Sequence, residues 1–172
     1  MRKVSHYFIA VFIYTLILGI PSHGKEYCNV LAISDGDTLT IQRHSKKESV
    51  RLIGIDTPET QPNERAKKQA QKLNRPIKDI LRNGKTAAQF VKTHIKPGSS
   101  VWIEWDAQKR DRYGRLLGYV FVPKGDVPFF LNEELLRQGY ADLLIIPPNT
   151  YYEIAFREAY QEAKKNRRGI WR

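Results

Sequence analysis

The amino-acid sequence predicts an α+β domain that is mainly β: a small closed barrel of five strands that carries three α-helices. Five short runs rich in β-branched and aromatic residues predict the strands. Apolar residues at helical spacing follow the third run and recur near the end of the chain. The length of 172 residues suits one domain with a substantial core better than two.

The first three predicted strands are close together in the chain. They are "YCNVLAIS" at 27–34, "DTLTIQR" at 37–43 and "SVRLIGI" at 49–55, and the turn-like "DGD" and the polar "HSKKE" separate them. This short spacing predicts a meander. Several of these runs have apolar residues on both alternating faces, which indicates that something covers the outer face of the sheet.

The segment 61–83 differs in character, because it is rich in Lys, Arg, Gln and Asn and its apolar stripe is thin. Pro76 interrupts its helical pattern. We expect an extended, exposed basic loop or a partly helical insertion there. After Gly84, "KTAAQFVKTHIKPG" has apolar residues at helical spacing and predicts a helix that ends at its Pro-Gly pair.

Two further strands, "SVWIEWD" and "LLGYVFV", precede two further helices. "FLNEELLRQG" reads as a short amphipathic helix stopped by Gly139. The last helix is expected to start at Thr150, whose "TYYE" has the capping-box pattern, and to end at Gly169. Trp171 is expected to pack back on the core. This order of elements favours the OB-fold, whose barrel face often binds nucleic acids or sugar chains.

The first 24 residues have the three-part layout of a secretory signal peptide. Basic residues at Arg2 and Lys3 precede a short apolar stretch from Tyr7 to Ile20, and small residues follow at Ser22 and Gly24. We expect cleavage there, which leaves a secreted or periplasmic domain of residues 25–172 with no membrane contact. An uncleaved membrane anchor is the alternative.

The composition is strongly basic. The chain carries 29 basic and 18 acidic residues, a net charge of +11. Residues 1–24 contain two of the basic residues and none of the acidic ones, so 27 against 18 remain, a net charge of +9. Such a domain suggests a polyanionic partner, namely nucleic acid, an anionic surface or an acidic polysaccharide, although excess charge can also serve solubility alone.

Cysteine and histidine usage excludes an internal disulfide and argues against a zinc site. Cys28 is the only cysteine of the sequence, so an internal disulfide is excluded. It lies in an apolar run, which indicates a small buried hydrophobe rather than a reactive thiol. The four histidines are scattered without ligand spacing, which argues against a zinc site.

Three stretches place polar groups beside predicted strands: "SDGDT", "RLIGIDTPE" and "RDRYGR". Asp37 opens the second strand and Asp56 closes the third, so neighbouring antiparallel strands can bring both carboxylates to the same rim of the barrel. Two carboxylates at such a short distance repel each other unless a cation or a proton lies between them. A hard divalent ion such as Ca²⁺ suits this place, and the backbone carbonyl of Thr57 can join its ligands.

The same stretches supply the other groups that phosphodiester hydrolysis needs. Glu59 lies three residues after Asp56 and can act as the base that orients or deprotonates a water. Arg51 and Arg115 can each hold two phosphate oxygens through a planar guanidinium. Taken singly, each stretch also fits a turn, a strand end or a surface arginine. In combination they favour an active site.

The motifs "DGDT", "RLIGIDTPE", "DRYGR", "LLRQGYA" and "GIW" together resemble the staphylococcal nuclease (thermonuclease) family, from about Val30 to Trp171. The resemblance implies an OB-fold barrel with three helices. It implies Ca²⁺-dependent endonuclease cleavage of DNA and RNA, with low sequence specificity, to 3′-phosphate products. It also implies the following roles: Asp37, Asp56 and the Thr57 carbonyl as calcium ligands, Asp35 as a nearby acidic residue, Glu59 as general base, Arg51 and Arg115 as phosphate-binding arginines, and Tyr113 beside the substrate phosphate.

The sequence departs from the family in two places. The 61–83 segment is longer than the corresponding loop of the staphylococcal enzyme, which puts substrate length and access in doubt. At the positions where the family has its nucleotide-pocket tyrosines, this sequence has Ile145 and Pro147, neither of which carries a phenol. This puts base preference in doubt. The alternative functions are a non-catalytic nucleic-acid-binding OB-fold protein and, if the N-terminal segment is retained, a membrane-held adhesion or processing factor. We expect a monomer without an obligate protein partner.

Overall fold

The computed structural model describes residues 24–172. The expected signal peptide therefore lies outside the described residues, apart from Gly24 at its end. In this described part of the chain, no helix is both long enough and apolar enough to span a membrane.

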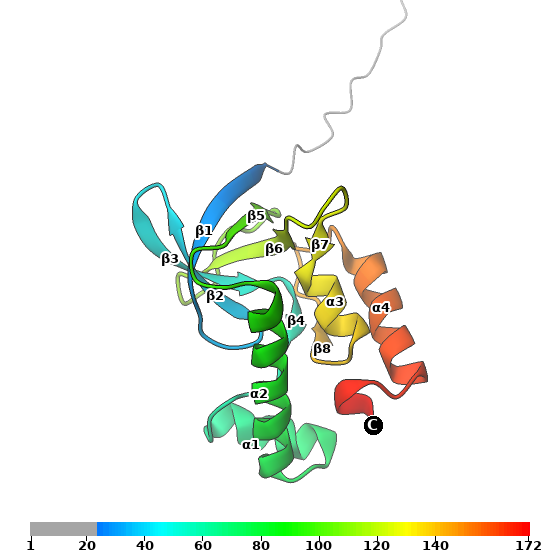
Figure 1. Ribbon diagram of the computed structural model, residues 1–172. Helices are drawn as coiled ribbons and strands as arrows, with labels where there is room; N and C mark the ends of the chain where they lie inside the picture. Colours follow the sequence, from blue (N-terminus) through cyan, green and yellow to red (C-terminus); the bar gives the residue numbers. More distant parts are fainter. Residues whose placement is uncertain (1–23) are drawn as a thin grey trace, which may run out of the picture.

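Five strands close into a barrel (Figure 1). They are β1 (Lys25–Ile33), β2 (Thr38–Arg43), β3 (Lys46–Leu52), β5 (Ser100–Glu104) and β6 (Leu116–Val122). β1, β2 and β3 form the expected meander, β1 also pairs with β5, and β5 pairs with β6. The parallel pairing of β6 with β3 closes the ring. The predicted five-stranded OB-fold barrel is thereby confirmed.

Three short strands lie beside the barrel. β4 (Gly54–Asp56) follows β3 and pairs with β8 (Asp142–Leu144), so that Asp56 lies opposite Asp142. β7 (Phe129–Phe130) extends the edge of β6. The chain can bend between β3 and β4 because Gly54 has a φ of +83°, and a Cβ at this position would lie 2.2 Å from the Phe156 ring. This bend carries Asp56 to the rim of the barrel.

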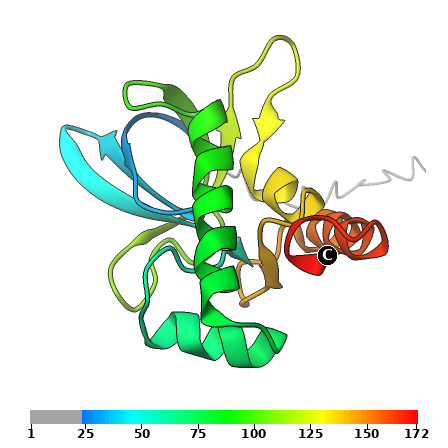
Figure 2. The same cartoon turned by 60° about the horizontal axis from the view of Figure 1, so that its bottom comes forward.

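Four α-helices and a short 3₁₀ helix accompany the barrel within residues 24–172, one α-helix more than expected. They are α1 (Glu64–Leu73), α2 (Ile77–His94), α3 (Leu131–Arg137), α4 (Glu153–Lys165) and η1 (Gly169–Trp171). α2 has its C-terminal half at the barrel, and α1 packs beside the N-terminal half of α2. α3 and α4 pack together on another side of the barrel (Figures 1 and 2).

The segment 61–83 is mostly helical, so the expected alternative of a helical insertion is the one observed and the extended loop is not. The Asn63 side chain accepts a hydrogen bond from the Ala66 amide at 2.8 Å and so caps α1, and Asn74 ends this helix in the left-handed conformation. Pro76 then stands at the start of α2, where its missing N–H costs nothing. The proline therefore begins a helix instead of interrupting one.

The apolar stripe of α1 is thin because its buried face is made of small residues. Ala66 and Ala70 pack against Ile80 of α2 in a cluster separate from the barrel core. α2 itself begins eight residues before the position expected from the sequence. Its buried face includes Gly84, Ala87 and further small or β-branched residues.

The barrel core is formed by alternating apolar residues of the strands together with α3. Asn132 of α3 is fully buried in it and joins β6 to the turn between β3 and β4, because its Oδ1 accepts from the Val120 amide at 2.9 Å and its Nδ2 donates to the Ile53 carbonyl at 2.9 Å. Cys28 is buried as expected, and burial raises the pKa of its thiol to about 11. At neutral pH this thiol stays protonated.

The C-terminal helix differs from expectation at its start. α4 begins at Glu153, and the Glu153 amide donates to the backbone carbonyl of Thr150 at 3.0 Å, so the expected side-chain capping box is wrong. At its other end the chain passes so close to Gly139 that a Cβ on Gly169 would lie 2.0 Å from the Gly139 carbonyl oxygen. Ile170 fills the core there, while Trp171 is half-buried against Tyr160.

Replacing Asn132 by alanine should lower the free energy of unfolding by about 2–4 kcal/mol, because two buried backbone groups lose their hydrogen-bond partner. Urea unfolding followed by circular dichroism measures the change. Asn166→Ala is the matched control, since the Asn166 side chain is exposed and bonds to the Glu162 carbonyl of its own helix. Equal losses in both variants would contradict a special role for Asn132.

Candidate active site

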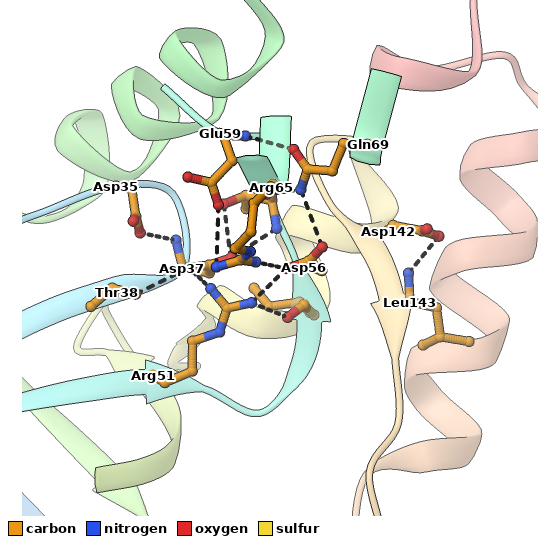
Figure 3. A network of polar contacts seen from close by, with 12 residues as sticks. Asp35, Asp37, Thr38, Arg51, Asp56, Glu59, Arg65, Gln69, Asp142 and Leu143 are labelled. Carbon is orange, nitrogen blue, oxygen red and sulfur yellow. Dashed lines mark hydrogen bonds and ion pairs between the residues drawn. The ribbon is translucent and has the colours of Figure 1, made fainter. Parts of the chain in front are cut away.

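One rim of the barrel collects five of the residues that the sequence singles out, namely Asp35, Asp37, Arg51, Asp56 and Glu59 (Figure 3). Asp37 precedes β2, and its neighbour Thr38 lies opposite Arg51 of β3. Asp56 ends β4, and Glu59 follows on the loop toward α1. The predicted meeting of the Asp37 and Asp56 carboxylates at one rim is borne out by their shared partner, Arg51.

The Arg51 guanidinium lies between the two aspartates and is buried, with 8% of its surface exposed. Its Nη1 forms an ion pair with Asp37, and its Nη2 lies 2.7 Å from Asp56 Oδ1 and 3.3 Å from the Ile55 carbonyl oxygen. Burial by itself lowers the pKa of Arg51, but the charges of Asp37 and Asp56 outweigh it and raise that pKa. The guanidinium is therefore charged at every accessible pH.

Asp37 is held by neighbouring groups on both oxygens. Its Oδ2 accepts from the amide and the hydroxyl of Thr57 at 2.8 and 2.9 Å, and its Oδ1 accepts from the Thr38 hydroxyl at 3.1 Å. Only 2% of its surface is exposed. These bonds tie the start of β2 to the loop after β4, so the Thr57 carbonyl has a fixed place in the site.

Asp35 adds a third carboxylate beside those of Asp37 and Asp56. Its Oδ1 accepts a hydrogen bond from the Asp37 amide at 3.2 Å. Burial and the nearby charge of Asp37 raise the pKa of Asp35 to about 6. Burial is the larger of these two causes, and the charge of Asp37 adds to it.

Glu59 is held by residues of α1 that the sequence reasoning missed. Its Oε2 accepts from Asn63 at 2.8 Å and its Oε1 lies 3.2 Å from the Arg65 guanidinium. Arg65 also reaches Asp56 Oδ1 at 2.6 Å. The sequence does carry one signal for these contacts. Asn63 lies four residues after Glu59 and is a residue type that caps helices, so a helix that begins there has its first residues close to Glu59.

Gln69 joins three parts of the same loop. Its Oε1 accepts from the Glu59 amide at 2.9 Å, while its Nε2 donates to the Thr57 carbonyl at 3.0 Å and to Asp56 Oδ2 at 3.2 Å. Lys72, one turn further along α1, forms an ion pair with Asp142 of β8 at 2.5 Å. α1 is thus attached to the strand that carries Asp56 and to its pairing partner.

Arg115 and Tyr113 lie in the loop before β6, outside the network in Figure 3. Arg115 contacts Asp111 at 2.8 Å, and Tyr113 is 69% exposed. Although burial raises the pKa of Asp111, its bonds to Arg115 and to loop amides lower that pKa overall. Leu117 is the register partner of Arg51. Arg115, two residues earlier, lies just before β6, the strand that pairs with β3.

The chemistry of the rim fits a hard divalent ion with few protein ligands. Asp37, Asp56 and the Thr57 carbonyl offer oxygen donors only, which calcium prefers. The Asp35 carboxylate, whose Oδ1 accepts from the Asp37 amide, adds a further acidic group beside them. Within residues 24–172, no three histidine, cysteine or acidic side chains are grouped to hold a metal. A cation held by Asp37, Asp56 and the Thr57 carbonyl alone would keep positions for water or phosphate.

Comparison with known proteins points to one family. The sequence profile described as "Staphylococcal nuclease homologue" matches residues 49–172. The chain is 33% identical over 153 residues to a thermonuclease of Staphylococcus hyicus, covering 89% of this chain and 80% of that protein. It is 38% identical over 148 residues to a thermonuclease of Staphylococcus intermedius, covering 86% and 77%. Endonuclease YncB of Bacillus subtilis (strain 168) is 34% identical over 139 residues, covering 80% and 57%.

Gly84 of α2 supports the Glu59 loop from behind, because a Cβ there would lie 2.3 Å from the Glu59 carbonyl oxygen and 2.6 Å from that of Pro58. Gly84→Ala should push this loop out of place and destabilise the fold by about 1–3 kcal/mol, despite the better helix propensity of alanine. Thermal unfolding measures the loss. Gln89→Ala, at an exposed position of the same helix, should leave stability within about 0.5 kcal/mol; a stabilised Gly84→Ala protein would contradict the close contact.

Proposed function

The chain belongs to the staphylococcal nuclease family, and from this premise we propose that it is a Ca²⁺-dependent endonuclease. In this proposal it hydrolyses phosphodiester bonds of DNA and RNA with low sequence specificity and leaves 3′-phosphate ends. Family membership supports the nuclease activity and the nucleic-acid substrates. The convergence of Asp37 and Asp56 on the buried Arg51 is the observation that carries the proposal, because it puts ligands and a phosphate-binding cation side by side.

Asp37, Asp56 and the carbonyl of Thr57 are the groups proposed to hold the calcium ion, and Asp35 adds negative charge behind them. When bound, the ion supplies positive charge beside a phosphate oxygen and makes phosphorus a better electrophile. The hydrogen bonds from Thr57 to Asp37 fix two of these three groups relative to each other before any ion arrives.

Glu59 is the proposed general base. Its side chain is 17% exposed, which leaves room for a water to approach it. Asn63 and Arg65 hold its two oxygens, and each oxygen retains a second lone pair for a water proton. In this role Glu59 orients the water and takes its proton as the oxygen attacks phosphorus.

Arg51 and Arg115 are the proposed cations for the phosphate, with Tyr113 beside it. Charge grows on the non-bridging oxygens as the water oxygen bonds to phosphorus, and a planar guanidinium can donate to two of these oxygens at once. The bond between phosphorus and the 5′-oxygen then breaks, and the phosphate stays on the 3′-oxygen. Arg115 must turn from Asp111 to take part, which its half-exposed position allows.

The proposal extends to where and how the protein acts. Residues 1–24 would direct export and be removed, leaving residues 25–172 as a secreted or periplasmic monomer that needs no protein partner. The secreted role is supported by the layout of the N-terminal sequence. N-terminal sequencing of exported protein tests it, and a retained N-terminus would contradict it.

Plasmid DNA and ribosomal RNA should both be degraded by the protein in Ca²⁺ and remain intact in a chelator, because the ion supplies charge that the arginines alone do not. Gel electrophoresis and end-group analysis of the products measure this, with 3′-phosphate ends expected. Binding of DNA without any cleavage in Ca²⁺ would instead favour the non-catalytic OB-fold protein.

Arg115→Ala should lower kcat by about 100-fold or more, since the loss of one charge-stabilising contact in the transition state costs roughly 3 kcal/mol. Steady-state digestion of a defined oligonucleotide measures it. Arg157→Ala is the control, because Arg157 is an exposed arginine paired with Glu153 on α4. Near-normal digestion by the Arg115→Ala protein would defeat the assignment of Arg115.

A further inference from the structure

Helix α1 reaches into the candidate active site through one cation, Arg65. Its Nη2 lies 2.6 Å from Asp56 Oδ1 and its Nη1 lies 3.2 Å from Glu59 Oε1. One guanidinium thus joins a proposed calcium ligand to the proposed general base. The planar fork of arginine makes this double contact possible, whereas a lysine offers a single point charge.

An ordinary surface ion pair does not explain this arrangement. Arg65 is 51% exposed, and an exposed pair on its own is worth little. However, the carboxylates that it contacts are much less exposed, 24% for Asp56 and 17% for Glu59. Asn63 and Gln69, from the cap and the second turn of the same helix, bond to the same two residues. α1 therefore grips this loop at several points.

Besides holding Glu59, Arg65 changes the net charge that a cation meets at the rim. Within the described residues, the acidic cluster consists of the four carboxylates of Asp35, Asp37, Asp56 and Glu59. The last three of these contact two guanidiniums, from Arg51 and Arg65, and Asp35 accepts from the Asp37 amide. Four negative and two positive charges leave two negative charges. That remainder matches one divalent cation, and loss of Arg65 would raise it to three.

The two guanidiniums differ in how they can respond to a cation. Arg51 is buried behind Asp37 and Asp56 and is held by both. Arg65 is half exposed and shares Asp56 Oδ1 with Arg51. It therefore occupies the solvent side of Asp56, from which an ion or a phosphate must approach.

We propose that Arg65 is a positioning residue that orients Glu59 and competes with the divalent cation for Asp56. The proposal rests on the function proposed above. In this proposal α1 controls both the orientation of the base and the affinity for the metal. α1 is formed by the segment 61–83, in which this sequence departs from the staphylococcal enzyme. Its signature is that loss of Arg65 moves the two properties in opposite directions.

The test is Arg65→Gln, with two measurements. Calorimetric titration with Ca²⁺ and no substrate should show about three- to tenfold tighter binding, because a competing cation is gone. At saturating Ca²⁺, kcat for an oligonucleotide should fall about tenfold, a typical loss when a group that orients a site residue is removed. KM should change by less than about threefold. A purely structural defect would weaken both calcium binding and catalysis.

Two further variants isolate the mechanism. Arg65→Lys keeps the charge but loses the fork, so its kcat should fall while its Ca²⁺ affinity stays near that of the parent protein. In a Glu59→Gln background, adding Arg65→Gln should lower the single-turnover rate by less than about twofold, since the group that Arg65 orients is already lost. Arg82→Gln, an exposed arginine paired with Asp79 on α2, is the control and should change neither property.

The proposal is overturned if Arg65→Gln binds Ca²⁺ no more tightly than the parent protein, or if its kcat is unchanged. It is also overturned if the loss in kcat is as large in the Glu59→Gln background as in the parent. A parent protein that binds Ca²⁺ but hydrolyses no nucleic acid would instead defeat the proposed function. The calorimetric comparison would still test the competition in that case.

Discussion

The buried Arg51 guanidinium, held between the carboxylates of Asp37 and Asp56, is the interaction on which the rest of the site depends. Removing charges from water is expensive, and a buried pair is rarely more stable than a well-packed apolar substitute. Removing one partner is far worse, at about 3–5 kcal/mol, because it leaves a buried charge unpaired. A site of this kind is better explained by what it binds than by the stability it adds.

The fold makes this arrangement possible by bringing strand ends to one rim. The pairing of β2 with β3 places Asp37 beside Arg51, and the glycine bend at Gly54 turns Asp56 back toward both. α2 then supports the Glu59 loop through Gly84, while Gln69 of α1 accepts from the Glu59 amide. Rigid strands thus hold the charged groups, and two helices hold the loop that carries the proposed base.

The sequence predicted the barrel and the meeting of its acidic residues well, because strand alternation and antiparallel pairing are local rules that "DGDT" and "RLIGIDTPE" obey. For the segment of α1 it predicted only an exposed loop or a partly helical insertion, since a helix that buries only Ala66 and Ala70 has almost no apolar stripe to detect. Nor could it place Arg65 or Gln69 against Asp56, because those contacts depend on how α1 docks. The capping pattern at Thr150 misled because backbone bonding alone starts α4.

The account can be tested most directly by a crystal structure of the protein soaked with Ca²⁺, with the ion located by anomalous scattering. It predicts a single ion at about 2.3–2.6 Å from oxygens of Asp37, Asp56 and the Thr57 carbonyl. The Arg51 side chain should remain beside it. An ion bound elsewhere, with Asp37 and Asp56 still closed on Arg51 and facing no cation, would contradict the account.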